Sequence, residues 1–234
     1  MAADSNAFNV ALSLLINLDA ALVDIVLLSL QVSLLAVCIA AVIGFPMGAA
    51  VALWRFPGRG GAVVVLNALM GLPPVVAGLV VYLLLSRAGP LGDWGLLFTP
   101  SAMVIAQVVL VLPILAALSR QKVEELLGEY QEQFVSLGMS RLRMMPTLLW
   151  DARFALLTVL LAGFGRASAE VGAVMMVGGN IDGVTRVMTT SIVLETSKGN
   201  LPLALGLGIV LLTLVLMINA AAYLVGEWAR RRTG

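Results

Sequence analysis

The sequence predicts an all-α membrane protein with about five transmembrane helices, and two observations carry this prediction. Of its 234 residues, 61% are hydrophobic and 12% are charged, whereas soluble domains average about 45–50% apolar and about 25% charged residues. The apolar residues are also gathered into runs long enough to cross a bilayer, which takes roughly 20 residues in a helix. Together these observations exclude an ordinary soluble domain.

Four of the five predicted spans contain no charged residue, and they cover residues 25–54, 60–86, 94–119 and 199–226. The remaining span covers residues 154–179 and is interrupted by Arg166 and Glu170. The first run is longer than a bilayer requires, so we expect it to tilt or protrude. Pro73 and Pro74 lie inside the second run, where a helix kink is the simplest expectation and a gate hinge is the alternative.

Lysine and arginine are distributed unevenly between the two sets of loops that five spans create. Of the 14 such residues, ten lie in one set of loops with the C-terminal tail, three lie in the other, and Arg166 lies within a span. Because positively charged loops stay in the cytoplasm, we expect the loop 119–152 and the basic tail 227–234 to be cytoplasmic. Residues 25–226 then form the membrane domain, and residues 1–24 form an outward-facing N-terminal segment.

The loop 119–152 is the most polar part of the chain. Apolar residues recur at helical spacing from 124 to 137 and predict a short amphipathic helix. Gly138 can adopt a positive φ and end this helix, and Ser140 can cap a second short helix over residues 141–145, before Pro146. One interpretation is an ordinary connector lying on the membrane surface; the other is a surface that another protein grips.

The spacing of Glu132 and Gly138 resembles the E-A-A-x-x-x-G loop of type I ABC transporter permeases, although Gln133 and Phe134 replace the two alanines. Trp150-Asp151 also stands where many of these permeases carry Leu-Pro. Two longer segments are similar to the permeases of molybdate and tungstate importers, most of all to the tungstate branch. They are "MGLPPVVAGLVVYLLLSRAGPLG" (70–92) and "RASAEVGAVMMVGGNIDGVTRVMTTSIVLETSKGN" (166–200). The resemblance covers about residues 25–225.

This resemblance implies a type I importer bundle in which the loop 119–152 forms coupling helices that sit in a groove of an ATPase subunit. The coupling residues that it implies are Glu132, Phe134, Leu137, Gly138 and Ser140, and Phe134 is the expected anchor. The implied partners are a second copy of the chain, cytoplasmic ABC ATPase subunits, an extracytoplasmic tungstate- or molybdate-binding protein and membrane lipid. The implied location is the plasma (inner) membrane of a bacterium or archaeon.

Arg166 and Glu170 are four residues apart, so they share one face of a helix. Charges inside a span are costly and usually face the protein interior or water. Three interpretations follow from this placement. The two residues form an ion pair that locks helix packing, or Arg166 adds positive potential to an anion pathway, or the membrane boundary lies elsewhere.

A polar loop follows the fourth span, where Gly178, Gly179 and Gly183 predict a turn. Hydroxyl groups and an arginine at an outer surface suit an oxyanion. The candidates are Asn180, Thr185, Arg186, Thr189 and Thr190. Docking of a binding protein explains such an exposed loop equally well.

The expected function is the membrane-spanning permease subunit of an ATP-driven oxyanion importer, with tungstate as substrate and molybdate or another oxyanion as the alternative. A stand-alone secondary transporter or channel is less favoured, because few intramembrane charges leave little machinery for ion coupling. We predict no catalytic residue and no metal site, since the chain lacks histidine, paired carboxylates and a nucleophile–base pair. ATP and Mg should bind to the partner ATPase, because no G-x-x-x-x-G-K-[ST] motif is present, and no nucleic-acid partner is expected.

Overall fold

The computed structural model describes residues 20–233, and the regular elements in this range are helices. In chain order they are α2 (Ala20–Leu53), α3 (Arg59–Met70), α4 (Pro74–Leu85), the 3-10 helix η1 (Gly92–Trp94), α5 (Pro100–Ser136), α6 (Arg141–Asp151), α7 (Arg153–Ser168), α8 (Gly172–Gly178), α9 (Met188–Ser197) and α10 (Leu201–Thr233). Most of the predicted outward-facing segment 1–24 lies outside the described residues.

Three described helices are long and apolar enough to cross a membrane alone, namely α2, α5 and α10. Two bent pairs pass the same test together: α3 with α4, which meet at 103°, and α6 with α7, which meet at 72°. Counting each bent pair as one span gives five. The structure therefore agrees with the predicted all-α membrane fold.

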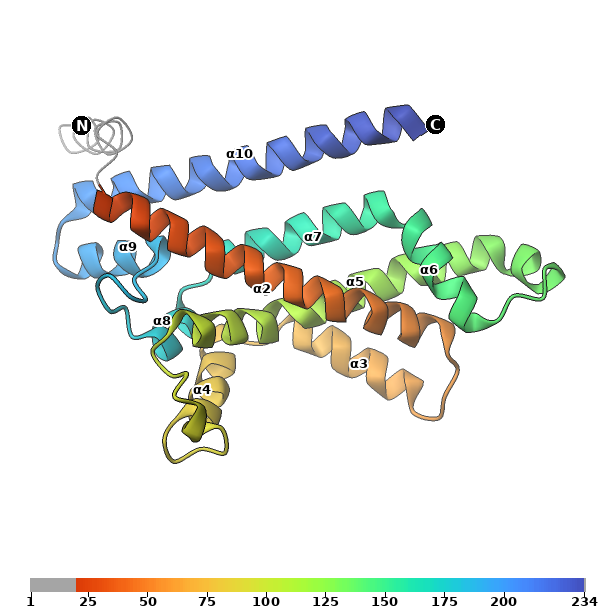
Figure 1. Ribbon diagram of the computed structural model, residues 1–234, viewed down its shortest axis with the longest axis horizontal. Coiled ribbons are helices and arrows are strands. Elements are labelled where there is room, and N and C mark those ends of the chain that lie inside the picture. The colour runs from red at the N-terminus through yellow and green to blue at the C-terminus, as the bar shows by residue number, and fades with distance from the viewer. Residues whose placement is uncertain (1–19, 234) are drawn as a thin grey trace.

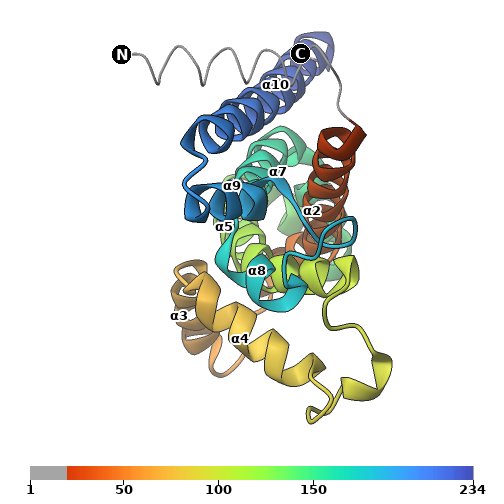
Figure 2. The ribbon, with the colours of Figure 1, turned by 90° about the vertical axis from the view of Figure 1, so that its left-hand side faces the viewer.

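Helix α5 is the central helix and α10 is peripheral (Figures 1 and 2). In their most apolar windows, 61% of α5 is buried inside the chain but only 22% of α10. Helix α2 crosses close to α5, and Gly48 permits this contact. A Cβ atom at Gly48 would lie 2.1 Å from Ser119 Oγ and 2.3 Å from the Ala116 carbonyl oxygen. Such a close approach of two backbones requires a glycine.

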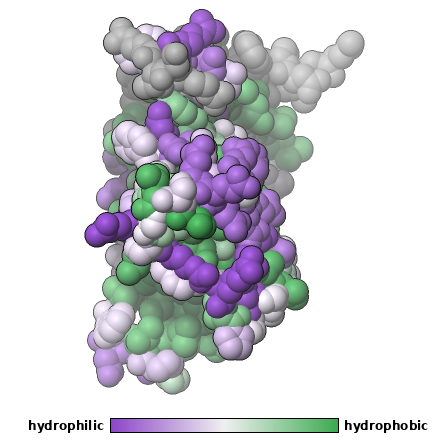
Figure 3. Space-filling model, turned by 90° about the vertical axis from the view of Figure 1, so that its right-hand side faces the viewer, coloured by the Kyte–Doolittle hydropathy of each residue, from purple (hydrophilic) through white to green (hydrophobic). Residues whose placement is uncertain are grey.

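The cations divide between the two ends of the bundle. Helices α2, α5 and α10 run in the same direction in Figure 1, so the α2–α3 loop, the α5–α6 turn and the C-terminus gather at one end. We call this the cation-rich end, because it holds the ten lysines and arginines counted above. Viewed from this side, hydrophilic residues cover much of the surface (Figure 3). Helices α8 and α9 lie at the opposite end (Figure 2).

Two predicted helices have different limits in the structure. The span predicted for 154–179 is not one helix, because α7 ends at Ser168 and α8 starts at Gly172. The Glu170 carboxylate accepts a hydrogen bond from the Ala173 N–H (3.1 Å), and this gives α8 an N-terminal partner of its own. The amphipathic helix predicted for 124–137 is not separate either, because α5 continues without a break to Ser136.

The prolines also act differently from the expectation. Pro74 is the first residue of α4, where its missing N–H leaves no helical hydrogen bond unmade, so the two prolines mark a break of 103° and not a kink within one helix. Pro146 was expected to end the helix starting at residue 141. It instead lies inside α6, which continues to Asp151.

Candidate functional site

The turn between α5 and α6 forms the tip of the cation-rich end (Figure 1). Gly138 has φ +60°, the positive value that the sequence predicts for it. The Met139 N–H then donates to the Phe134 carbonyl oxygen over 3.0 Å, which gives one carbonyl at the end of α5 a partner. Ser140 occupies the N-cap position of α6, but its side chain makes no capping hydrogen bond, so the expected cap is absent.

Phe134 packs inside the chain. Only 6% of its surface is exposed, and it belongs to an apolar cluster with Leu126 and Leu148. Its ring meets Tyr130 edge-on, with the ring centroids 6.0 Å apart. The buried ring offers a partner little surface, so this packing does not favour the expectation that Phe134 is the anchor, which stays a prediction. Phe134 thereby packs the tip against cluster members from α2, α6 and α7.

Large apolar side chains surround the turn on its outside. Val135, Leu137 and Leu142 are 69%, 72% and 72% exposed, and we call these three residues the apolar turn. Glu132 is exposed beside them and forms no ion pair within residues 20–233. Exposed apolar groups in the middle of a polar surface are typical of a protein–protein interaction site. The exposed Leu137 therefore offers a partner more surface than Phe134 does.

Glu124 joins α5 to the neighbouring loop at the base of the tip. Its Oε1 pairs with Arg59 Nη2 and its Oε2 with Arg120 Nη1. Arg59 Nε also donates to the Val51 carbonyl oxygen over 2.8 Å, near the end of α2. Since charge-assisted hydrogen bonds are stronger than neutral ones, this network fixes α2, α3 and α5 relative to one another.

Arg166 and Glu170 lie at the end of α7, beside the break before α8. Arg166 Nη2 is 3.7 Å from Glu170 Oε2, and the two side chains are 39% and 4% exposed. The Glu170 carbonyl oxygen accepts a hydrogen bond from Thr189 Oγ1 over 2.9 Å. With its carboxylate bonded to the Ala173 N–H, Glu170 connects α7, α8 and α9. Arg166 keeps an accessible guanidinium.

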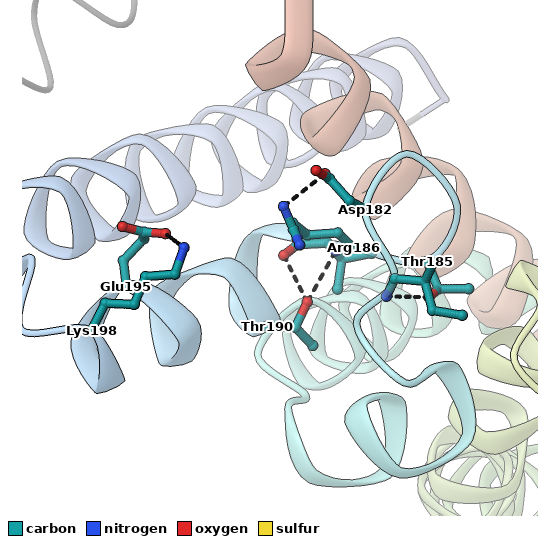
Figure 4. Close-up of polar contacts among 8 residues, drawn as sticks. Asp182, Thr185, Arg186, Thr190, Glu195 and Lys198 are labelled. Atoms are coloured by element: carbon teal, nitrogen blue, oxygen red, sulfur yellow. Dashed lines mark hydrogen bonds and ion pairs between the residues drawn. The ribbon is translucent and has the colours of Figure 1, made fainter.

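The three threonines predicted for the outer surface are buried. Thr185 and Thr190 are 0% exposed, and Thr189 is 8% exposed. Thr185 Oγ1 donates to the Gly178 carbonyl oxygen over 2.6 Å. The Thr190 hydroxyl bonds to the backbone of Val187 (Figure 4). These hydroxyls hold the loop together, so the three threonines are not at the outer surface where the sequence analysis expects them.

The other two candidates of this loop stay closer to the surface. Arg186 Nη1 is 2.7 Å from Asp182 Oδ1, and the Asp182 side chain is 80% exposed (Figure 4). Asn180 is half-buried with φ +51°, and its side-chain oxygen has no hydrogen-bond partner among the described residues. The surface that this loop offers is therefore an ion pair beside a turn, and not a row of hydroxyls.

A second ionic contact closes the corner between α9 and α10. Glu195 accepts hydrogen bonds from Lys198 Nζ (2.8 Å) and from Asn200 Nδ2 (3.0 Å). These two hydrogen bonds, the one from Lys198 first, lower the pKa of Glu195 below its ordinary value. The carboxylate is therefore held ionised at neutral pH.

A polar cavity inside the bundle contains residues that the sequence analysis missed. Its volume is about 20 Å³, and its polar lining includes Ser29, Ser33, Gln107, Ser168 and Glu170. Gln107 is 4% exposed, its Nε2 donates to the Ala167 carbonyl oxygen (3.1 Å), and its Oε1 has no hydrogen-bond partner among residues 20–233. Gln107 is the only polar side chain between residues 102 and 118. This isolated position in an apolar run is the sequence signal that could have found it. The cavity has room for about one water molecule, too little for a tetrahedral oxyanion.

Three curated proteins are similar to this chain over most of its length. An anion ABC transporter permease protein of Haloferax volcanii is 42% identical over 204 residues, which cover 85% of this chain and 88% of that protein. The tungstate uptake system permease protein TupB of Peptoclostridium acidaminophilum is 40% identical over 95% of this chain and 98% of its own length. TupB of Campylobacter jejuni is 36% identical over 92% and 90%. This chain belongs to the ABC transporter permease family. No family model matches it.

The cation-rich end is therefore one end of an ABC transporter permease. The permease is a multi-pass membrane protein with three to five spans, and its polar insert is a firmly packed tip with an exposed apolar turn. Within residues 20–233, no three Cys, Asp or Glu side chains are grouped so that they could hold a metal ion. The exposed apolar turn on this polar end is suited to contact with another protein.

Proposed function

We propose that this permease is the membrane subunit of a tungstate importer driven by a separate ATPase. The observation that carries the proposal is its similarity to two tungstate uptake permeases, at 36–40% identity over more than 90% of the chain. Sulfate transport permeases of Escherichia coli also match, but at 29–32% identity over 68–82% of the chain. Tungstate is thus the first choice among oxyanions, and molybdate, of nearly the same size and charge, is the alternative.

The ATPase would grip the permease at the apolar turn. Val135, Leu137 and Leu142 supply a surface that an apolar groove can cover, with Glu132 at its rim. This mode, in which a helix end enters a groove of the partner, is common in protein recognition. The permease itself hydrolyses nothing in this scheme, and ATP with Mg binds to the ATPase.

Movement of the tip would reach the far side of the membrane through α5. This helix has 37 residues, so at 1.5 Å per residue it is about 55 Å long. The cluster around Phe134 and Leu148 joins the tip to α2 and α7, and α7 leads to the junction at Glu170. A push at the turn is therefore transmitted as a rigid-body rotation, because close-packed interiors do not absorb small displacements.

The pathway for the anion would lie between two copies of the permease. The internal polar cavity is too small for an oxyanion, but a groove between α7 and α10 has a volume of about 500 Å³. Gly165 and Gly208 line it, and a Cβ at either position would have no atom of another described element within 4 Å. Small residues that leave room for a backbone favour packing against another membrane helix. The accessible Arg166 beside this groove would then attract the anion, without binding it tightly enough to stop its release.

The orientation follows from the cation-rich end. Its ten lysines and arginines support a cytoplasmic location, where the ATPase would act. The opposite end, with the Arg186–Asp182 pair, would meet an extracytoplasmic tungstate-binding protein. The membrane is the plasma membrane, and a binding protein of this kind makes the choice between similar oxyanions.

Reconstitution tests the proposal. The permease alone in liposomes should move no tungstate, whereas adding the ATPase and binding protein of the same transporter, with ATP inside, should start uptake. Tungstate should compete with molybdate and outcompete sulfate. Vigorous transport by the permease alone would refute the dependence on a separate ATPase. Uptake that only sulfate inhibits would refute tungstate as the substrate.

Labelling tests the orientation separately. Cys38 is the only cysteine and is exposed, so a Cys38→Ser background accepts single cysteines. Glu132→Cys should react with a membrane-impermeant maleimide only in inside-out vesicles, and Asp182→Cys only in right-side-out vesicles. The reverse pattern would overturn the orientation.

A further inference from the structure

A hollow at the cation-rich end, bordered by Val135 of the apolar turn, has the chemistry of an anion site. It lies between the end of α2, the start of α3, the extension of α5 and the start of α6. Its volume is about 600 Å³, within the range of small-molecule sites. From this hollow we infer that the permease binds a tetrahedral oxyanion group, of the phosphate class, at its cation-rich end.

The charge of the lining is strongly positive. Arg55, Arg59 and Arg141 line the hollow, and Glu124 is the single acidic residue among its lining residues. Glu124 is already occupied by Arg59 and by Arg120. Arg55 and Arg141 are exposed and form no ion pair with any described residue. Two free guanidinium groups therefore face one concave space, and their planar donors match the oxygens of a phosphate-like anion.

The backbone adds to this potential. Helices α3 and α6 both begin at an arginine of the hollow, Arg59 and Arg141. Neither helix has a side chain that caps its N-terminus. The partial positive charge of each N-terminus and its unpaired N–H groups therefore remain available to an anion.

This shape favours a small anionic group over an acidic surface of another protein. The arginines line a recess, whereas Leu137 and Leu142 of the apolar turn are exposed and lie outside its lining. Two sources can supply the same chemistry: a free oxyanion in the cytoplasm, or the phosphate of an anionic phospholipid at the membrane surface. Experiments with each source distinguish them.

Inorganic phosphate is the first probe, used on the purified full-length permease in detergent. At ten times its dissociation constant it should raise the unfolding temperature by about 3 °C relative to chloride at equal ionic strength. The variant Arg55→Gln/Arg141→Gln should lose this shift. Arg143→Gln, which removes the same charge from α6 outside the hollow, should keep it. Arg55→Lys/Arg141→Lys should keep part of it, because the charge stays and only the planar donors go.

Phospholipid is the second probe, used in nanodiscs of phosphatidylcholine with or without phosphatidylglycerol. If the lipid is the source, phosphatidylglycerol should remain bound to the wild type in native mass spectrometry and be lost from the double glutamine variant. If the free anion is the source, only phosphate should bind.

Three results would overturn the inference. One is the absence of binding by both probes. Another is binding that the double glutamine variant retains. The third is a double glutamine variant that still binds the probes as the wild type does but no longer associates with the ATPase. That result would assign the two arginines to contact with the partner protein. None of these results bears on tungstate uptake, so the inference and the proposed function fail independently.

Discussion

Replacing Leu137 by alanine should weaken binding of the ATPase to the permease without unfolding the permease. Leu137 is 72% exposed, so nearly three quarters of its side chain is available to a partner. Burying a whole leucine side chain is worth about 1.5–3 kcal/mol, and this fraction of it gives about 1–2 kcal/mol. The expected loss of affinity is therefore about 5- to 30-fold. It is measured by titrating labelled ATPase subunit against the full-length permease in nanodiscs.

Two further variants make this measurement decisive. Phe134→Ala should instead destabilise the permease by about 3–5 kcal/mol, because the ring is 6% exposed inside a packed cluster. Leu27→Ala, at an exposed position of α2 near the opposite end, should change neither property. Normal ATPase affinity in Leu137→Ala would refute the proposed role of the apolar turn. Phe134→Ala with unchanged thermal stability and lost ATPase binding would restore Phe134 as the anchor.

Three other predictions concern the stability of the permease, measured by thermal unfolding in detergent. Gly48→Ala should cost about 1–3 kcal/mol, because the new methyl group must push α2 away from α5; an unchanged unfolding temperature would show that the two helices are not in this contact. Glu170→Ala should cost about 1–3 kcal/mol by leaving the buried Ala173 N–H without an acceptor, whereas Glu170→Gln keeps an acceptor and should cost less; equal losses would assign the effect to charge. The lowered pKa of Glu195 predicts stability that is present above the unfolded value, about 4.3, and lost as the pH falls through the lower folded value. Glu195→Gln should remove this pH dependence, and an unchanged profile would contradict the contact with Lys198.

The sequence was sufficient for the membrane fold and the position of the tip. Apolar runs and the scarcity of charges reflect the solvent around each segment, which is a property of composition that needs no knowledge of the partners. The same holds for the ten cations at one end, and for Gly138, whose positive φ follows from the lack of a Cβ atom. Family resemblance predicts a coupling role for the loop 119–152 for a similar reason, since a motif is local in the chain.

Only the tertiary structure decided which side chains of the tip and of the loop around 180–190 are exposed and which are buried. Phe134 and Leu137 share the amphipathic pattern of one helix, yet 6% of the first and 72% of the second is exposed. The difference depends on α6 folding back over Phe134, a contact between segments that no local pattern encodes. Thr185 and Thr190 are buried by hydrogen bonds that close their own loop, and the end of α7 at Ser168 depends on how Glu170 bonds to the next helix. Hydropathy determined which segments meet lipid, because the preference for lipid or water belongs to each residue alone. Burial within the protein depends instead on neighbours that the fold brings together.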